Sequence, residues 1–192
     1  MKANVQLKTT TMRTSRTIKR LFLVFLSFFV SSIFISCGQS KAEYMKKVNG
    51  VSGEMSDIVE LSSQTRDRIV EVWNDAIDNN QYDGEYVDDF NTALQNEMSQ
   101  GQASQLISQL QGYKSQLDAD MKELRNYPSS CKDAYNDLVE AYGEVCKLYN
   151  DATNPSGSLM TYSESSLTDY QNADKAIQQF NVKYQQDSNE EE

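Results

Sequence analysis

The most constraining feature of this sequence is a regular alternation of apolar side chains three and four residues apart between residues 135 and 152. That spacing places the apolar side chains on one face of an α-helix, and it is typical of helices that pack with a left-handed twist. The seam consists of Tyr135, Leu138, Tyr142, Val145, Tyr149 and Ala152. We therefore expect this helix to lie inside a helical bundle.

Four further stretches carry apolar stripes at helical spacing, and they predict the remaining helices. The first stripe begins at Met55, and Tyr44, Val48 and Val51 before it stay nearly in phase with it. The first predicted helix therefore starts either after residue 53 or near Ala42. It ends before the loop at residues 79–84. The stripes are Met55, Ile58, Leu61, Ile69, Val72, Trp73 and Ala76; Tyr86, Phe90, Leu94 and Met98; Leu106, Leu110, Tyr113, Leu117, Met121 and Leu124; and Leu167, Tyr170, Ala173, Ile177, Phe180 and Tyr184.

The second and third of these stripes do not fit on one straight helix. At about 100° per residue, the stripe that begins at Leu106 lies roughly 150° around the helix from the stripe that ends at Met98. The polar segment at residues 99–102 lies between them and contains Gly101. We therefore predict a break or a strong bend at Gly101, and we expect Pro128 to end the third segment.

Polar residues predict where the last two helices begin. Ser130 with Asp133, and Thr161 with Glu164, have the three-residue spacing of an N-terminal cap and its acidic partner. The segment at residues 154–158 contains proline and glycine, and it predicts the turn between the two helices.

The composition agrees with an all-α fold. The chain has only two prolines and eight glycines, and it is rich in residues that favour helices over strands. We predict an antiparallel bundle of four or five helices with coiled-coil-like packing over residues 54–185. Residues 186–192 are acidic and have nothing to bury, so we expect a disordered tail.

The charges divide the chain at Cys37. Before this residue there are six basic residues and no acidic one, and after it 12 basic residues face 28 acidic ones, a net charge of −16. A basic segment followed by an apolar one is typical of an export signal. The apolar run at residues 21–35 is 15 residues long, whereas a membrane-spanning helix needs about 20. Met12 is an alternative start to Met1.

The end of the apolar run, Phe34-Ile35-Ser36-Cys37, resembles the signal box of bacterial lipoproteins. The resemblance covers the leader only, and Phe34 stands where the family usually has an aliphatic residue. It implies that a lipid is attached to the thiol of Cys37 and that the leader is cut just before it. Two or three acyl chains anchor a protein stably in a membrane. The alternatives are an ordinary secretory signal and an uncleaved single-pass signal anchor.

These observations give a predicted domain organisation. Residues 1–36 are a lipoprotein signal peptide, and residues 37–53 are the lipidated N-terminus and a tether that can extend into the first helix. We expect the protein to be exported and held at the bacterial cell envelope by the lipid on Cys37. The acidic domain should repel nucleic acid, which we exclude as a partner.

Two features suggest further sites and are better explained without them. Cys131 and Cys146 are 15 residues apart, so on one helix they lie about 22 Å from each other, too far for a disulfide. We expect two free thiols, with an intermolecular bridge through Cys131 as the alternative.

The segment from Asn79 to Gly84 is similar to a calcium loop, but the twelfth position of such a loop would be Phe90 instead of a bidentate carboxylate. We predict no metal site and expect a solvated, acidic start of a helix.

The sequence gives little support for catalysis. It has no histidine, which is the commonest general base and zinc ligand, and no glycine-rich phosphate loop. We expect that the protein is not an enzyme and binds no cofactor. The tyrosines of the seam should belong to the core. The favoured function is that of a lipid-anchored protein-interaction or assembly module. The alternative is a carrier that holds a small apolar or aromatic ligand between its helices, and this carrier should have a ligand-sized cavity.

Overall fold

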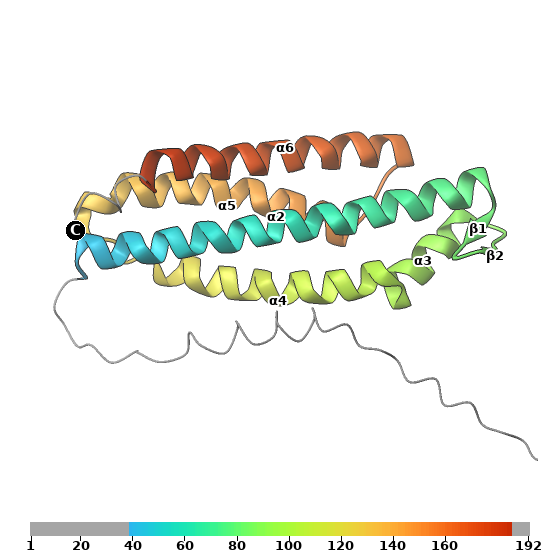
Figure 1. Cartoon of the computed structure of the whole chain (residues 1–192), viewed down its shortest axis with the longest axis horizontal. Helices are drawn as coiled ribbons and strands as arrows, with labels where there is room; N and C mark the ends of the chain where they lie inside the picture. The colour runs from blue at the N-terminus through green and yellow to red at the C-terminus, as the bar shows by residue number, and fades with distance from the viewer. Residues whose placement is uncertain (1–38, 186–192) are drawn as a thin grey trace, which may run out of the picture. The chain divides into compact units, whose positions relative to one another are not determined.

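A computed structural model describes residues 39–185, and it confirms the all-α bundle (Figure 1). Four long helices lie side by side, and a short helix and a small hairpin are at one end. The elements are α2 (Lys41–Asp78), β1 (Gln81–Tyr82), β2 (Glu85–Tyr86), α3 (Phe90–Gln100), α4 (Gln102–Glu123), a 3-10 turn (Ser129–Cys131), α5 (Lys132–Thr153) and α6 (Leu159–Tyr184).

Helix α2 is the axis of the bundle and contacts each of the other helices. It begins at Lys41, so the earlier of the two predicted starts is correct, and much of the expected tether belongs to the helix. Ser40 caps it: the Ser40 hydroxyl accepts a hydrogen bond from the Glu43 amide at 3.2 Å, and the Glu43 carboxylate accepts one from the Ser40 amide at 3.2 Å. Tyr44 is fully buried, and its hydroxyl donates to the Leu124 carbonyl at the end of α4.

The predicted break at Gly101 is confirmed. Helix α3 ends at Gln100, α4 begins at Gln102, and Gly101 between them has an extended backbone conformation. The stripe predicted for the second helix was partly wrong, because Tyr86 belongs to a hairpin and Phe90 is the first residue of α3. The residues of α3 that are buried are Ala93 and the charged Glu97.

A two-residue turn connects the strands of the hairpin. Gln81 pairs with Tyr86, and Tyr82 pairs with Glu85. Asp83 and Gly84 both have positive φ angles, 51° and 82°, as a type I′ turn requires. Asp89 then caps α3 by accepting a hydrogen bond from the Asn91 amide at 3.2 Å. The acidic start expected for this helix is present only in part: Asp89 is the cap, the first turn of α3 has no acidic residue, and Asp83 and Glu85 belong to the hairpin.

Both predicted caps of the last two helices were wrong. Pro128 leads into the 3-10 turn, so Ser130 lies inside that turn and its side chain does not cap α5. Helix α6 begins earlier than predicted, because the Ser158 hydroxyl accepts a hydrogen bond from the Thr161 amide at 3.2 Å. On α6, Leu167 is 44% exposed and the adjacent Ser166 is buried in its place.

The interior is filled by apolar side chains from α2, α4, α5 and α6. On α5 the predicted seam residues Leu138, Val145 and Ala152 are fully buried. The seam tyrosines are half-buried and pack against this core, as do other tyrosines of the bundle. Cys131, which is buried, and Cys146, which is half-buried, are not bonded to each other, as their spacing predicts.

The expected signal peptide, the lipidation site Cys37 and the acidic tail 186–192 lie outside the described residues. Within residues 39–185, no helix combines the length and the apolar character that crossing a membrane requires.

Candidate functional site

The region where α2 ends contains a buried ion pair, an open pocket and exposed apolar side chains. We call this region the hairpin end; it contains the last turns of α2, the hairpin, α3 and the first turn of α6 (Figure 1). The opposite end contains the start of α2, the end of α4 and the start of α5. Tyr44 joins these elements through its hydrogen bond to Leu124.

A buried ion pair organises the hairpin end. The Glu97 side chain is fully buried, and the Arg68 guanidinium of α2 donates to both of its oxygens, at 3.1 and 2.9 Å. Arg68 also donates to Asp83 of the hairpin turn at 2.8 Å and to Glu71 at 3.3 Å. One arginine thereby joins α2, the hairpin and α3, which fixes the position of the hairpin on the bundle.

The same carboxylate explains the break between α3 and α4. Gly101 has no side chain with which to cap α4, and the Glu97 carboxylate accepts a hydrogen bond from the Ala103 amide at 2.6 Å instead. A Cβ atom at Gly101 would overlap the Glu97 carboxylate and lie 2.7 Å from the Tyr82 hydroxyl. Glycine is therefore required at this position because the carboxylate occupies the space of a side chain.

The pKa shifts of this cluster follow from its contacts. Burial alone would raise the pKa of Glu97, but the hydrogen bonds from Arg68 and Ala103 and the charge of Arg68 hold it below its ordinary value. The hydrogen bond to Glu97 raises the pKa of Arg68. Burial and the hydrogen bond to Glu97 raise the pKa of Tyr82 to about 12. All three groups keep one protonation state near neutral pH, so the cluster is structural and not poised for proton transfer.

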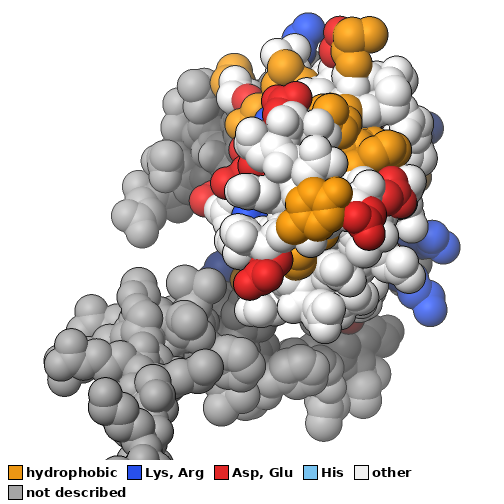
Figure 2. All heavy atoms as spheres, turned by 90° about the vertical axis from the view of Figure 1, so that its right-hand side faces the viewer, with side chains coloured by type: hydrophobic (Ala, Val, Ile, Leu, Met, Phe, Trp, Pro, Cys, Tyr) orange, Lys and Arg blue, Asp and Glu red, His pale blue; other side chains and the backbone are white. Residues whose placement is uncertain are grey.

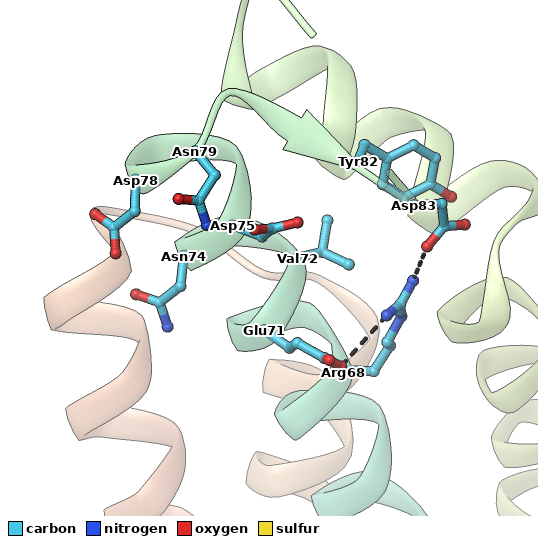
Figure 3. Close-up of a pocket in the computed structure, with 9 residues that line it drawn as sticks. All are labelled: Arg68, Glu71, Val72, Asn74, Asp75, Asp78, Asn79, Tyr82 and Asp83. Atoms are coloured by element: carbon cyan, nitrogen blue, oxygen red, sulfur yellow. Dashed lines mark hydrogen bonds and ion pairs between the residues drawn. The ribbon is translucent and has the colours of Figure 1, made fainter. Parts of the chain in front are cut away.

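An open pocket of about 580 Å³ lies beside this cluster (Figure 3). Arg68 and Asp83 are on one side of it, and polar residues of the last turns of α2 are on the other. Glu71, Asp75 and Asp78 make the pocket acidic, and Val72 contributes an apolar side chain. The lining favours a cationic group over an apolar ligand.

Apolar side chains are exposed on the surface of the same end. The end-on view shows hydrophobic and acidic side chains interspersed (Figure 2). Tyr86 is 73% exposed, Met160 70%, Ile77 49% and Phe90 37%. We call these four residues the hairpin-end surface.

An aromatic row supports this surface from below. The buried Trp73 stacks on Phe90, with ring centroids 6.1 Å apart, and lies 5.9 Å from the ring of Tyr162 on α6. Ile77 follows Trp73 by one helical turn, and Met160 precedes Tyr162 by two residues. The exposed side chains are therefore held by rigid elements and not by a loop alone.

Acidic residues dominate this end. From residue 69 to residue 113 the chain has eight acidic residues and no basic one. Glu97 and Asp83 are paired with Arg68, whereas Glu85 and Asp88 are exposed. The opposite end mixes both signs, with ion pairs such as Lys47–Glu123 and Lys183–Asp137. The charge of the bundle is therefore uneven along its length.

The segment compared with a calcium loop is the hairpin. Its Asp83 is already paired with Arg68, and within residues 39–185 no group of three or more acidic, cysteine or histidine side chains is arranged to hold a metal ion. Phe90, which stands where a calcium loop has its bidentate carboxylate, is the first residue of α3.

The tyrosines of the α5 seam lie at the edge of the core. The Tyr142 hydroxyl donates to Asp118 at 2.6 Å and accepts from Lys114 at 3.2 Å. Tyr135 stacks on Tyr127, with centroids 4.8 Å apart. Each of these rings contacts residues of the bundle itself, as expected for packing.

Comparisons with known proteins give no relatives: no family model matches the chain, and neither a curated protein nor a solved structure is significantly similar to it.

Proposed function

We propose that this protein is a lipid-anchored protein of the bacterial cell envelope whose acidic helical bundle binds another protein. The observation that carries the proposal is the contrast between a filled interior and an exposed apolar surface at the hairpin end. Four of the seven large apolar side chains that are exposed within residues 39–185 lie on elements of this end, and a concentration of exposed apolar side chains is typical of interaction sites. We expect neither catalysis nor a cofactor.

The carrier alternative has less support. A carrier needs an apolar cavity between its helices. Two pockets of about 580 and 430 Å³ are open at the surface of the bundle, and their linings are mostly polar. The large side chains between the helices, among them Leu110, Leu138 and Ile58, are fully buried and fill the interior.

The anchor gives the bundle an orientation. Only three residues separate Cys37 from Lys41, where α2 begins. Helix α2 has 38 residues and, at about 1.5 Å per residue, reaches about 57 Å. A lipid on Cys37 would hold the start of α2 at the membrane and leave the hairpin end free to project toward a partner.

Fatty-acid labelling tests the anchor. We expect the wild-type chain to incorporate a labelled fatty acid in its own cells, and Cys37→Ala to remain unlabelled and uncut. Cys131→Ala is the matched control, because this buried thiol lies far along the chain and its loss should leave the label unchanged. A labelled Cys37→Ala protein would contradict the anchor.

Cross-linking of the intact envelope tests the binding function. The tagged full-length chain, cross-linked in cells and then purified, should bring down the same protein repeatedly. An unrelated lipoprotein with the same tag is the control. A chain that brings down only a small apolar molecule would support the carrier instead.

A further inference from the structure

We propose that the hairpin-end surface is the docking site for the partner, and that the partner has an apolar contact ringed by lysine and arginine. This inference rests on the proposed function, and it adds the place of binding and the chemistry of the partner. Its core is Tyr86, Phe90, Ile77 and Met160.

The four apolar side chains are exposed, and one of them, Phe90, is packed against a buried ring. Tyr86 and Met160 are each at least 70% exposed. Tyr86 lies four residues before Phe90 and Met160 lies two residues before Tyr162, and the rings of Phe90 and Tyr162 both contact Trp73. Aromatic residues and methionine are enriched at protein interfaces, where they bury large areas. Because Trp73 stacks on Phe90, fixing the Phe90 ring on binding costs little conformational entropy.

Acidic residues lie beside two of the four apolar side chains, Tyr86 and Ile77. Glu85 and Asp88 flank Tyr86 in the sequence and are exposed, and Asp75 and Asp78 line the pocket near Ile77. The two arginines near this end are already paired: Arg68 with Glu97, Asp83 and Glu71, and Arg66 with Asp67. A partner must therefore supply the positive charge, because complementary potentials steer and orient association.

The same charges disfavour two other occupants. A second copy of the chain that docks through this surface would bring the acidic residues of both copies together, and like charges in contact are costly. An anionic lipid surface would be repelled for the same reason. The pocket beside Arg68 fits the commitment to a basic protein, since its carboxylates can receive a long cationic side chain of the partner.

Site-specific photo-cross-linking tests this docking site. The full-length chain is produced in its own cells with the photoreactive residue p-benzoylphenylalanine in place of Tyr86. The matched control has it in place of Val182, which is 69% exposed near the end of α6. We expect a cross-link from position 86 to a different protein, at least tenfold stronger than from position 182. Mass spectrometry should place lysine or arginine beside the cross-linked residue of the partner.

Charge neutralisation gives the second readout. Glu85→Gln combined with Asp88→Asn should lower the cross-linking yield at position 86 at least threefold. The control pair Asp133→Asn and Glu140→Gln, on exposed positions of α5, should leave it unchanged.

Several outcomes would overturn the docking site. They are cross-links from position 86 only to a second copy or only to lipid, equal yields at the two positions, and a yield that the neutralising pair does not change. A partner cross-linked only from position 182 would contradict the docking site and leave the proposed function standing. No protein cross-link from either position would also contradict the docking site; it would contradict the proposed function as well only if cross-linking of the intact envelope brings down no protein.

Discussion

At the scale of single residues, Glu97 and Gly101 determine how the chain turns at the hairpin end. A carboxylate that is fully buried needs partners for its charge and its oxygens. Arg68 and the Ala103 amide supply them, and Gly101 leaves the space for them. The interruption of the helix is therefore built around one side chain.

The first prediction concerns that space. Gly101→Ala should destabilise residues 38–192 by about 1–3 kcal/mol, because the new methyl group overlaps a carboxylate that is already held by Arg68. The matched control is Gly112→Ala in the middle of α4, where a Cβ meets nothing within 4 Å. It should stabilise by up to about 1 kcal/mol. Urea unfolding measures both, and a stabilising Gly101→Ala would contradict the role of Glu97.

The sequence predicts the break but not its cause. The shift of the apolar face between Met98 and Leu106 indicates where the helix is interrupted. The burial of Glu97 is unexpected, because acidic residues are almost never fully buried unless they are paired. Its partner is 29 residues away, so nothing in the local pattern points to it.

A second carboxyl group is held differently. Glu54 of α2 lies half-buried against Asp120 of α4. Burial is the largest cause that raises the pKa of Glu54, to about 7, and the negative charge of Asp120 and its hydrogen bond to Glu54 act in the same direction. Between about pH 4.5 and 7 the folded chain keeps a proton that the unfolded chain has released, so the stability falls as the pH rises through this window.

The second prediction follows from this proton. Residues 38–192 should be less stable at pH 7.5 than at pH 5.5, and Glu54 should account for about 1–3 kcal/mol of the difference. Glu54→Gln should raise the stability at pH 7.5 and flatten the profile, whereas Glu140→Gln, exposed on α5, should keep it. Urea unfolding at the two pH values measures this. An unchanged slope in Glu54→Gln would refute the assignment.

At the scale of the elements, regular spacing predicts helices better than it predicts their ends. The α5 seam correctly identifies Leu138, Val145 and Ala152 as core. The start of α6 at Ser158 was missed, because serine residues at several positions there can each serve as a cap. The hairpin was missed as well, although Asp83-Gly84 is a recognised signal for a type I′ turn.

The third prediction compares two adjacent residues of α5. Leu138 is fully buried and Val139 is 40% exposed. Leu138→Ala should therefore cost about 2–5 kcal/mol. Val139→Ala should change the free energy of unfolding by less than about 0.5 kcal/mol. Asp137 is unsuitable as a neutral control, because it accepts hydrogen bonds from Lys183 and Tyr184, both at 2.6 Å. Equal urea midpoints for the two variants would place the seam at the surface.

At the scale of the whole molecule, the fold separates charges that the composition averages. The sequence shows a strongly acidic domain, and it predicts the bundle in which that charge is arranged. The uneven distribution depends on which helix ends meet, because the mixed-sign end combines residues from α2, α4, α5 and α6. The exposure of Tyr86 and Met160 depends on the same packing, so the hairpin-end surface could not be predicted from the apolar stripes.

Native mass spectrometry of the wild-type chain shows in one measurement whether the bundle carries a lipid and binds another protein. The protein is extracted from its own membrane in a mild detergent and weighed intact, first as a complex and then after release of its partners. We expect residues 37–192 with two or three acyl chains, associated with a different protein. A chain that keeps its leader and lacks acyl groups, or one that releases only a small apolar molecule, would contradict this expectation.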